Sequence, residues 1–200
     1  KWLIVAITVI GTTAGYFIGE SVPRTYQAEA RFWFDKSKSA SSVFSDDLFK
    51  DEAWIQLVKS YQVQDYVVME RRLYIDHDEN DGVFKTFLVD TSFAPGKYKL
   101  RVRENKMVEL THADGRTVQT AQVGAMIGKP LGFNWQPSKA ALRPGREISF
   151  EVMTFRDAAK RLDEQLTVQM PNTTFMQITL KGKTADGVAN TVNAMANRFL

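Results

Sequence analysis

The chain opens on an apolar stretch, followed by segments in which apolar and polar residues alternate. No charged residue occurs from Trp2 to Gly19, a run of 18 residues. At about 1.5 Å of helical rise per residue, that length just reaches across a hydrocarbon core of roughly 30 Å. Gly11, Gly15 and Gly19 recur at a spacing that lets helix backbones approach closely in lipid. The pattern predicts a transmembrane helix over residues 1–20, with the three glycines as its packing face.

A buried helix of a soluble domain is the alternative interpretation of this run. Its threonines and glycines have low helix propensity in water, which favours the membrane. Lys1 precedes the run and assigns the preceding segment to the cytoplasmic side, because basic residues are enriched there. The sequence begins with Lys rather than Met, so we expect it to start inside a longer gene product.

Strict alternation follows the apolar run and predicts a strand with one buried face over residues 26–34. One side of this strand carries Tyr26, Ala28, Ala30, Phe32 and Phe34, and the other carries Gln27, Glu29 and Arg31. After a polar, serine-rich segment, apolar residues return at helical spacing between residues 46 and 73. This second pattern predicts one interrupted helix or two short ones.

A β-rich middle follows, in which residues 97–103, 106–112 and 116–124 alternate between apolar and polar side chains. The Asp114-Gly115 pair between the last two segments is a strong hairpin signal, because glycine accepts the positive φ of such turns. We therefore predict a β-hairpin insert at about residues 93–137. A further strand follows, with its inward side chains at Ile148, Phe150 and Val152.

The last third of the chain predicts a helix over 156–166, strands over 167–171 and 175–183, and a closing helix. The closing helix has Thr184 or Asp186 as its N-cap residue. Its apolar positions are Val188, Val192, Met195, Ala196 and Phe199. Together these elements predict an α+β fold: an N-terminal transmembrane helix followed by a mixed α/β domain over residues 21–200.

Composition narrows the class of function. The chain has 26 basic and 23 acidic residues and a net charge of +3, and the two signs are interleaved along the sequence. A nucleic-acid partner is therefore not expected, because such partners select a basic stripe. There are no cysteines, which excludes disulfides, thiolate metal sites and cysteine nucleophiles.

Motifs that would carry chemistry are incomplete. The acidic loop at 76–82 starts like a calcium loop, but Asp81 replaces the turn glycine and Phe87 stands where the bidentate glutamate belongs. The chain also lacks a phosphate-binding glycine loop and a serine elbow. We predict no catalytic residue, cofactor or metal site in these residues. Trp135, in a loop-like segment, is the candidate for a sugar contact.

Several segments in order resemble one family. Pro23 follows the apolar run and precedes a Tyr-x-Ala-x-Ala strand at Tyr26, Ala28 and Ala30. Lys59 and Ser60 precede a valine pattern on the next helix. Asp186 and Asn193 lie in the closing helix, with Gly187 where the family usually has proline. The chain thus resembles the Wzz-type chain-length determinants of bacterial polysaccharide co-polymerases. The β-rich middle is similar to the longer members, which have a periplasmic coiled coil and often a tyrosine kinase.

The resemblance implies a protein of the bacterial inner membrane with most of this chain in the periplasm. Such a protein forms a ring-like homo-oligomer and regulates the chain length or export of a surface or secreted polysaccharide, as a scaffold and not as a catalyst. Its implied partners are itself, a polysaccharide polymerase or outer-membrane export channel, the membrane and the nascent glycan. The sequence shows no coiled coil, second span or kinase motif in these residues, and the resemblance leaves open whether such segments follow residue 200 or precede Lys1. The alternative is a single-pass periplasmic domain that senses a ligand through a pocket in the β-rich middle.

Overall fold

The computed structural model describes residues 2, 8, 11–13, 15–16, 25–33, 51–77, 82–172 and 175–199. The chain divides into two compact units. The central unit is Lys59–Glu164, and the terminal unit combines the residues up to Val58 with Gln165–Leu200. The central unit is larger than the β insert predicted at about 93–137.

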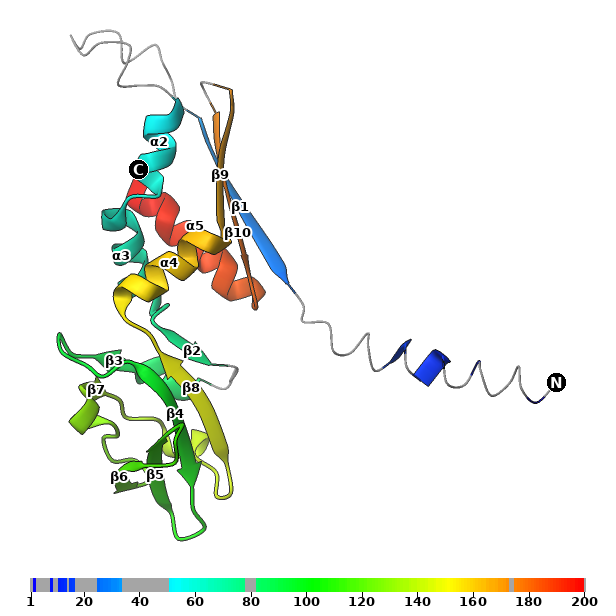
Figure 1. Cartoon of the computed structure of the whole chain (residues 1–200). Helices are drawn as coiled ribbons and strands as arrows, with labels where there is room; N and C mark the ends of the chain where they lie inside the picture. Colours follow the sequence, from blue (N-terminus) through cyan, green and yellow to red (C-terminus); the bar gives the residue numbers. More distant parts are fainter. Residues whose placement is uncertain are drawn as a thin grey trace. The chain divides into compact units, whose positions relative to one another are not determined.

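The terminal unit is built on a three-stranded antiparallel sheet of order β1-β10-β9. Its strands are β1 (Tyr26–Trp33), β9 (Leu166–Asn172) and β10 (Phe175–Gly182). Helix α5 (Ala185–Phe199) packs on β1 and β10, and α2 (Asp51–Val58) lies beside β9 (Figure 1). Because β1 and β10 come from opposite ends of the chain, the sheet joins the two termini of the described domain.

Alternation of side chains explains which face of this sheet is buried. Ala28 and Ala30 on β1 are half-buried, whereas Glu29 between them is exposed. On β10, opposite the alanines, Ile178 and Leu180 are buried. Small alanine side chains next to large aliphatic ones let a helix pack closely on the sheet.

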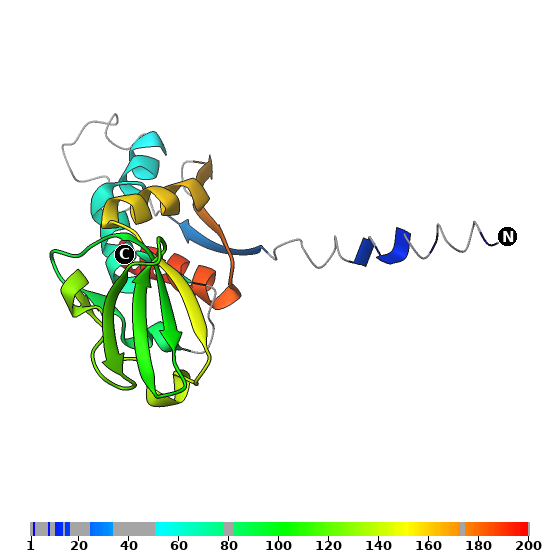
Figure 2. The ribbon, with the colours of Figure 1, turned by 60° about the horizontal axis from the view of Figure 1, so that its bottom comes forward.

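The central unit contains a five-stranded antiparallel sheet of order β2-β8-β4-β5-β6. Its strands, drawn side by side in Figure 2, are β2 (Ile75–His77), β4 (Gly96–Val102), β5 (Met107–His112), β6 (Thr117–Gln122) and β8 (Glu147–Val152). The unit also holds a two-stranded sheet of β3 (Leu88–Val89) and β7 (Phe133–Asn134). Its helices are α3 (Tyr61–Arg71) and α4 (Phe155–Gln165), with short 3-10 turns η3 (Val83–Thr86), η4 (Lys129–Leu131) and η5 (Lys139–Ala141).

An aromatic cluster forms the core of the central unit. Trp135 is fully buried, and its ring lies 5.0 Å from that of Phe84 and 5.3 Å from that of Phe87, measured between centroids. Phe150 on β8 contacts all three rings. The indole Nε1–H of Trp135 donates to the Val83 carbonyl at 3.0 Å, so its one polar group is satisfied inside the core.

Much of the predicted secondary structure is confirmed. Ile148, Phe150 and Val152 are buried on β8, and both hairpins of the β-rich middle are present, with Gly115 at φ 87°. The helical pattern between residues 46 and 73 gives two short helices, α2 and α3. Thr184 is the capping residue of α5, because its Oγ1 accepts the Gly187 N–H at 3.3 Å.

The predicted fold class is wrong in its N-terminal element. Within the apolar run, the described residues Trp2, Thr8, 11–13 and 15–16 have helical backbone, but no helix in the described part of the chain is long and apolar enough to cross a membrane. The run of 18 residues lies at the lower limit of spanning length, and its glycines and threonines weaken a helix. The mixed α/β description is also corrected, because all strand pairs described are antiparallel and the fold is α+β.

Two glycines of the central unit, Gly115 and Gly132, differ in the space that a side chain would find around them. Gly132 has φ 73°, and a Cβ there would meet the Ser92 carbonyl oxygen and lie 2.9 Å from the Phe93 Cα. Gly115 has φ 87° with open space around it. We expect Gly115→Ala to cost about 1–2 kcal/mol of unfolding free energy, from the positive φ alone, and Gly132→Ala to cost at least about 3 kcal/mol, because backbone must also move. Chemical denaturation of both variants measures the difference, and equal losses would contradict it.

Candidate functional site

The Lys-Ser pair of the family-like motif lies at the break between α2 and α3. Ser60 has an extended backbone, and its carbonyl accepts the N–H groups of Val63 at 3.2 Å and Gln64 at 3.1 Å, which starts α3. Lys59 Nζ lies 3.2 Å from Asp163 Oδ1 on α4. Gln64 Nε2 donates to the same carboxylate oxygen at 3.1 Å. The pair therefore starts one helix and links it to another within the central unit.

The other motif residues gather in the terminal unit. Tyr26, Ala28 and Ala30 lie on β1, opposite Gly182, Leu180 and Ile178 of β10, respectively. Asp186 lies in the first turn of α5, and Asn193 is exposed on the same helix. The structure thus brings together motif residues from both ends of the chain, while Lys59 and Ser60 belong to the central unit.

Two of the three glycines proposed as a packing face, Gly11 and Gly15, lie among the described residues. A Cβ built at Gly11 or Gly15 would meet nothing within 4 Å. Gly19 and Pro23 lie outside the described residues. No contact of the described chain therefore supports helix packing at these positions.

The proposed sugar contact at Trp135 requires correction. Its side chain is fully buried and is enclosed by phenylalanine rings, so neither face of the indole is available to a sugar. A loop-like sequence does not reveal this, because the packing partners Phe84, Phe87 and Phe150 are distant in sequence. Trp135 is a core residue.

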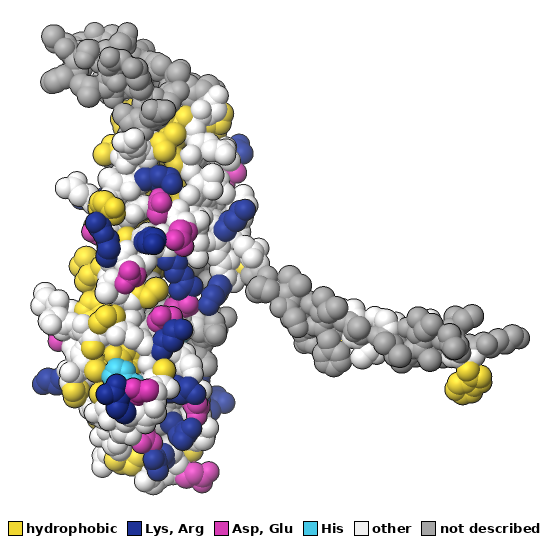
Figure 3. All heavy atoms as spheres, viewed as in Figure 1, with side chains coloured by type: hydrophobic (Ala, Val, Ile, Leu, Met, Phe, Trp, Pro, Cys, Tyr) yellow, Lys and Arg dark blue, Asp and Glu magenta, His cyan; other side chains and the backbone are white. Residues whose placement is uncertain are grey.

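Ion pairs lie on the solvent-facing side of the five-stranded sheet. The patterns in the sequence did not predict these ion pairs. Glu147 accepts hydrogen bonds from Lys99 Nζ at 3.1 Å and from Arg101 Nη2 at 2.7 Å. Glu109 accepts from Arg103 Nη2 at 2.7 Å and from the Thr117 hydroxyl at 3.0 Å. On the face drawn in Figure 3, basic and acidic side chains are accordingly interspersed. Opposite charges at paired positions of neighbouring strands are the signal, but it is readable only once the register is known.

These pairs shift the acids toward the ionised form. Hydrogen bonds from Arg101 and then Lys99 lower the pKa of Glu147 below its usual range. A hydrogen bond from Arg103, followed by one from Thr117, lowers the pKa of Glu109 in the same way. Both carboxylates therefore stay charged at neutral pH and neutralise the basic residues beside them.

A cleft of about 600 Å³ lies at one end of this sheet. Buried Val102 and Leu142 form its apolar floor, and Lys106 and Lys139 reach its walls. No carboxylate is among the residues that line it. Its volume lies within the roughly 300–1,000 Å³ of small-molecule sites, and its polarity suits a ligand with an apolar body and a negative charge.

The described residues contain no cluster of three or more His, Asp or Glu side chains that could hold a metal ion. The two histidines lie on different strands, each against an aromatic ring. His77 on β2 stacks on Phe84 at 4.4 Å between centroids, and His112 on β5 lies 4.7 Å from Tyr98. The expectation of a chain without catalytic groups stays a prediction.

Models of known protein families and a search of curated proteins give no match to the chain. The likeness to the Wzz-type family therefore rests on the residues named above.

Acid titration tests the ion pairs on the five-stranded sheet. Because the folded pKa of Glu147 is lowered, its stabilising contribution is full above its ordinary value of 4.5 and is lost as the pH falls through the lowered value. We expect Glu147→Gln to be less stable than the wild type at pH 7, and the difference to shrink as the pH falls below 4.5.

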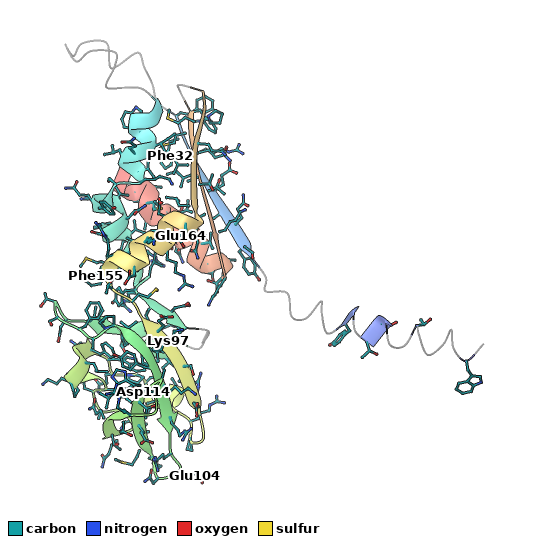
Figure 4. All side chains as sticks on the ribbon, in the orientation of Figure 1. Phe32, Lys97, Glu104, Asp114, Phe155 and Glu164 are labelled. Atoms are coloured by element: carbon teal, nitrogen blue, oxygen red, sulfur yellow. The ribbon has the colours of Figure 1, made fainter. Side chains whose placement is uncertain are left out.

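Glu104, at the tip of the β4–β5 hairpin (Figure 4), is the matched control, because it has no ion pair within the described chain. Urea unfolding of Glu104→Gln across the same pH range should follow the wild type. A pH-independent gap between Glu147→Gln and the wild type would contradict the assignment.

Proposed function

We propose that this chain is the scaffold domain of a polysaccharide co-polymerase similar to the Wzz type. It would act at the bacterial inner membrane, with the domain in the periplasm, and regulate the chain length or export of a surface or secreted polysaccharide. The observation that supports this best is the pairing of β1 with β10, next to α5. This pairing unites the two terminal segments that resemble the family.

The pairing of β1 with β10 supports the proposal because each motif alone is weak evidence for the family. Tyr26, Ala28 and Ala30 at one end and Asp186 at the other are common residue types. The strand that carries Tyr26, Ala28 and Ala30 pairs along its full length with β10, and Asp186 follows β10 in the same unit, whereas Lys59 and Ser60 lie in the central unit. Scattered matches arising by chance would have no reason to meet in this way.

A scaffold acts by geometry, and it needs surfaces for other subunits and partners. Helix α3 supplies one, because it exposes three large apolar or aromatic side chains: Tyr61 at 59%, Tyr66 at 44% and Met69 at 58%. Exposed apolar groups gathered on one helix mark interaction surfaces. We propose that α3 contacts neighbouring subunits of a homo-oligomer, which in turn holds a polymerase or an export channel.

Complementation tests this proposal. Deleting the gene in its native host should change the length distribution or the yield of one surface or secreted polysaccharide, and the full-length gene should restore it. Met69→Lys should raise the dissociation constant of the oligomer about tenfold in analytical ultracentrifugation, because a charge replaces an apolar contact, and it should fail to restore the distribution. Thr120→Lys, an exposed change on β6, is the control and should behave as the wild type. An unchanged polysaccharide profile after deletion would refute the proposal.

A second candidate function is ligand sensing, which the cleft beside β4 and β5 favours. Its apolar floor and its two lysines would accept an anionic ligand with an apolar body. A sensing domain needs a concave site for its ligand, whereas a scaffold does not.

Binding of the anionic dye 8-anilinonaphthalene-1-sulfonate tests the cleft in the full chain. We expect saturable fluorescence enhancement, weakened about tenfold by Lys139→Glu, because the reversed charge repels the sulfonate. Lys97→Glu makes the same charge reversal at an exposed position outside the cleft and should leave the affinity unchanged. Equal weakening by both variants would show that only the overall charge matters and would exclude the cleft.

A further inference from the structure

We propose that the central unit binds a monoanionic carboxylate in a cavity between the start of α3 and the exposed face of α4. The cavity has a volume of about 250 Å³. Helix α4 runs between the labelled residues Phe155 and Glu164 in Figure 4. This site goes beyond the proposed function and does not depend on it.

Two carboxylates line the cavity, and the protein already occupies both. Asp163 accepts from Lys59 at 3.2 Å and from Gln64 at 3.1 Å, and Gln64 is only 2% exposed. Asp157 is engaged by the residue that caps α4. Its Oδ2 accepts the Thr154 hydroxyl at 2.6 Å, and its N–H donates to the Thr154 oxygen at 3.1 Å. Asp163 is thus paired with Lys59, whereas Asp157 is bonded to a neutral hydroxyl and keeps its negative charge.

Arg156 is held in place without an acidic partner. Its guanidinium carbon lies 3.6 Å from the centre of the Tyr61 ring. A cation over an aromatic face is stabilised by the ring, and the N–H donors of a guanidinium point outward in its own plane. The stack therefore orients Arg156 while leaving its edge able to donate.

Lys160 adds a second cation one helical turn further along α4, on the same face as Arg156. Within the described part of the chain, neither side chain has an ion pair. The geometry therefore leaves two donors of positive charge beside one cavity, and a carboxylate can accept from both at once.

Charge and volume define the ligand. Lys59, Arg156 and Lys160 against Asp157 and Asp163 leave one net positive charge in the cavity wall, which a single negative charge balances. The volume is below the roughly 300–1,000 Å³ of sites that enclose a whole ligand, so the cavity takes the carboxylate end of a molecule. That carboxylate can belong to a simple organic acid or to a uronate sugar.

Titration of the ¹⁵N-labelled full chain with sodium acetate, sodium D-glucuronate and glucose at constant ionic strength tests the site by NMR. We expect glucuronate to shift the amide signals of residues 59–64 and 154–163, either together with acetate or without it. Glucose should not shift these signals. Similar dissociation constants for acetate and glucuronate would identify a simple carboxylate as sufficient. Binding of glucuronate alone would identify a uronate sugar.

Variants locate the binding. Arg156→Gln and Lys160→Gln should each raise the dissociation constant about tenfold, because each removes a charged donor. Lys97→Gln removes one charge of the same unit away from the cavity and is the matched control. Lys160 touches no ring in the described chain, so its variant keeps the test valid if the loss of the Arg156 stack disturbs folding.

Equal effects of Lys160→Gln and Lys97→Gln, tighter binding of inorganic phosphate, or equal shifts with glucose would overturn the proposal. None of these outcomes bears on polysaccharide length in the native host.

Discussion

The pairing of β1 with β10 is the constraint on which the terminal unit depends. Within the described residues β1 is bonded to the sheet through β10 alone, and α5 packs on both strands. The first strand that the structure describes therefore pairs with the last one, β10. Pairing over such a sequence separation carries a large loop-closure cost and is typical of slowly folding proteins.

The central unit rests on a different kind of interaction. Its strands β4, β5 and β6 follow one another through short hairpins, and its core is a cluster of aromatic rings around Trp135. Rings at centroid distances of 5.0–5.4 Å bury large areas and fix one another's orientation. The hairpins are local, whereas the aromatic cluster joins residues that are distant in the sequence of this unit.

Local patterns in the sequence were sufficient to predict most strands and helices. Alternation at Ile148, Phe150 and Val152 reported burial correctly, because a strand has only two faces. The apolar run at the N-terminus predicted a span, whereas no helix in the described part of the chain is long and apolar enough to cross a membrane. Trp135 misled because its burial depends on rings far away in sequence. The ion pairs of Glu147 and the cavity beside Arg156 could not be predicted either, because both depend on register and on helix packing that no single segment contains.

The ion pair between Lys59 and Asp163 bears on how the central unit is closed. Lys59 is the first residue of the central unit and Asp163 is its last but one, so a contact of 3.2 Å holds the two ends of that unit together. In chain order this unit is an insertion between Val58 and Gln165 of the terminal unit. Its two ends are therefore joined by a contact of its own and not only by the chain on either side of it.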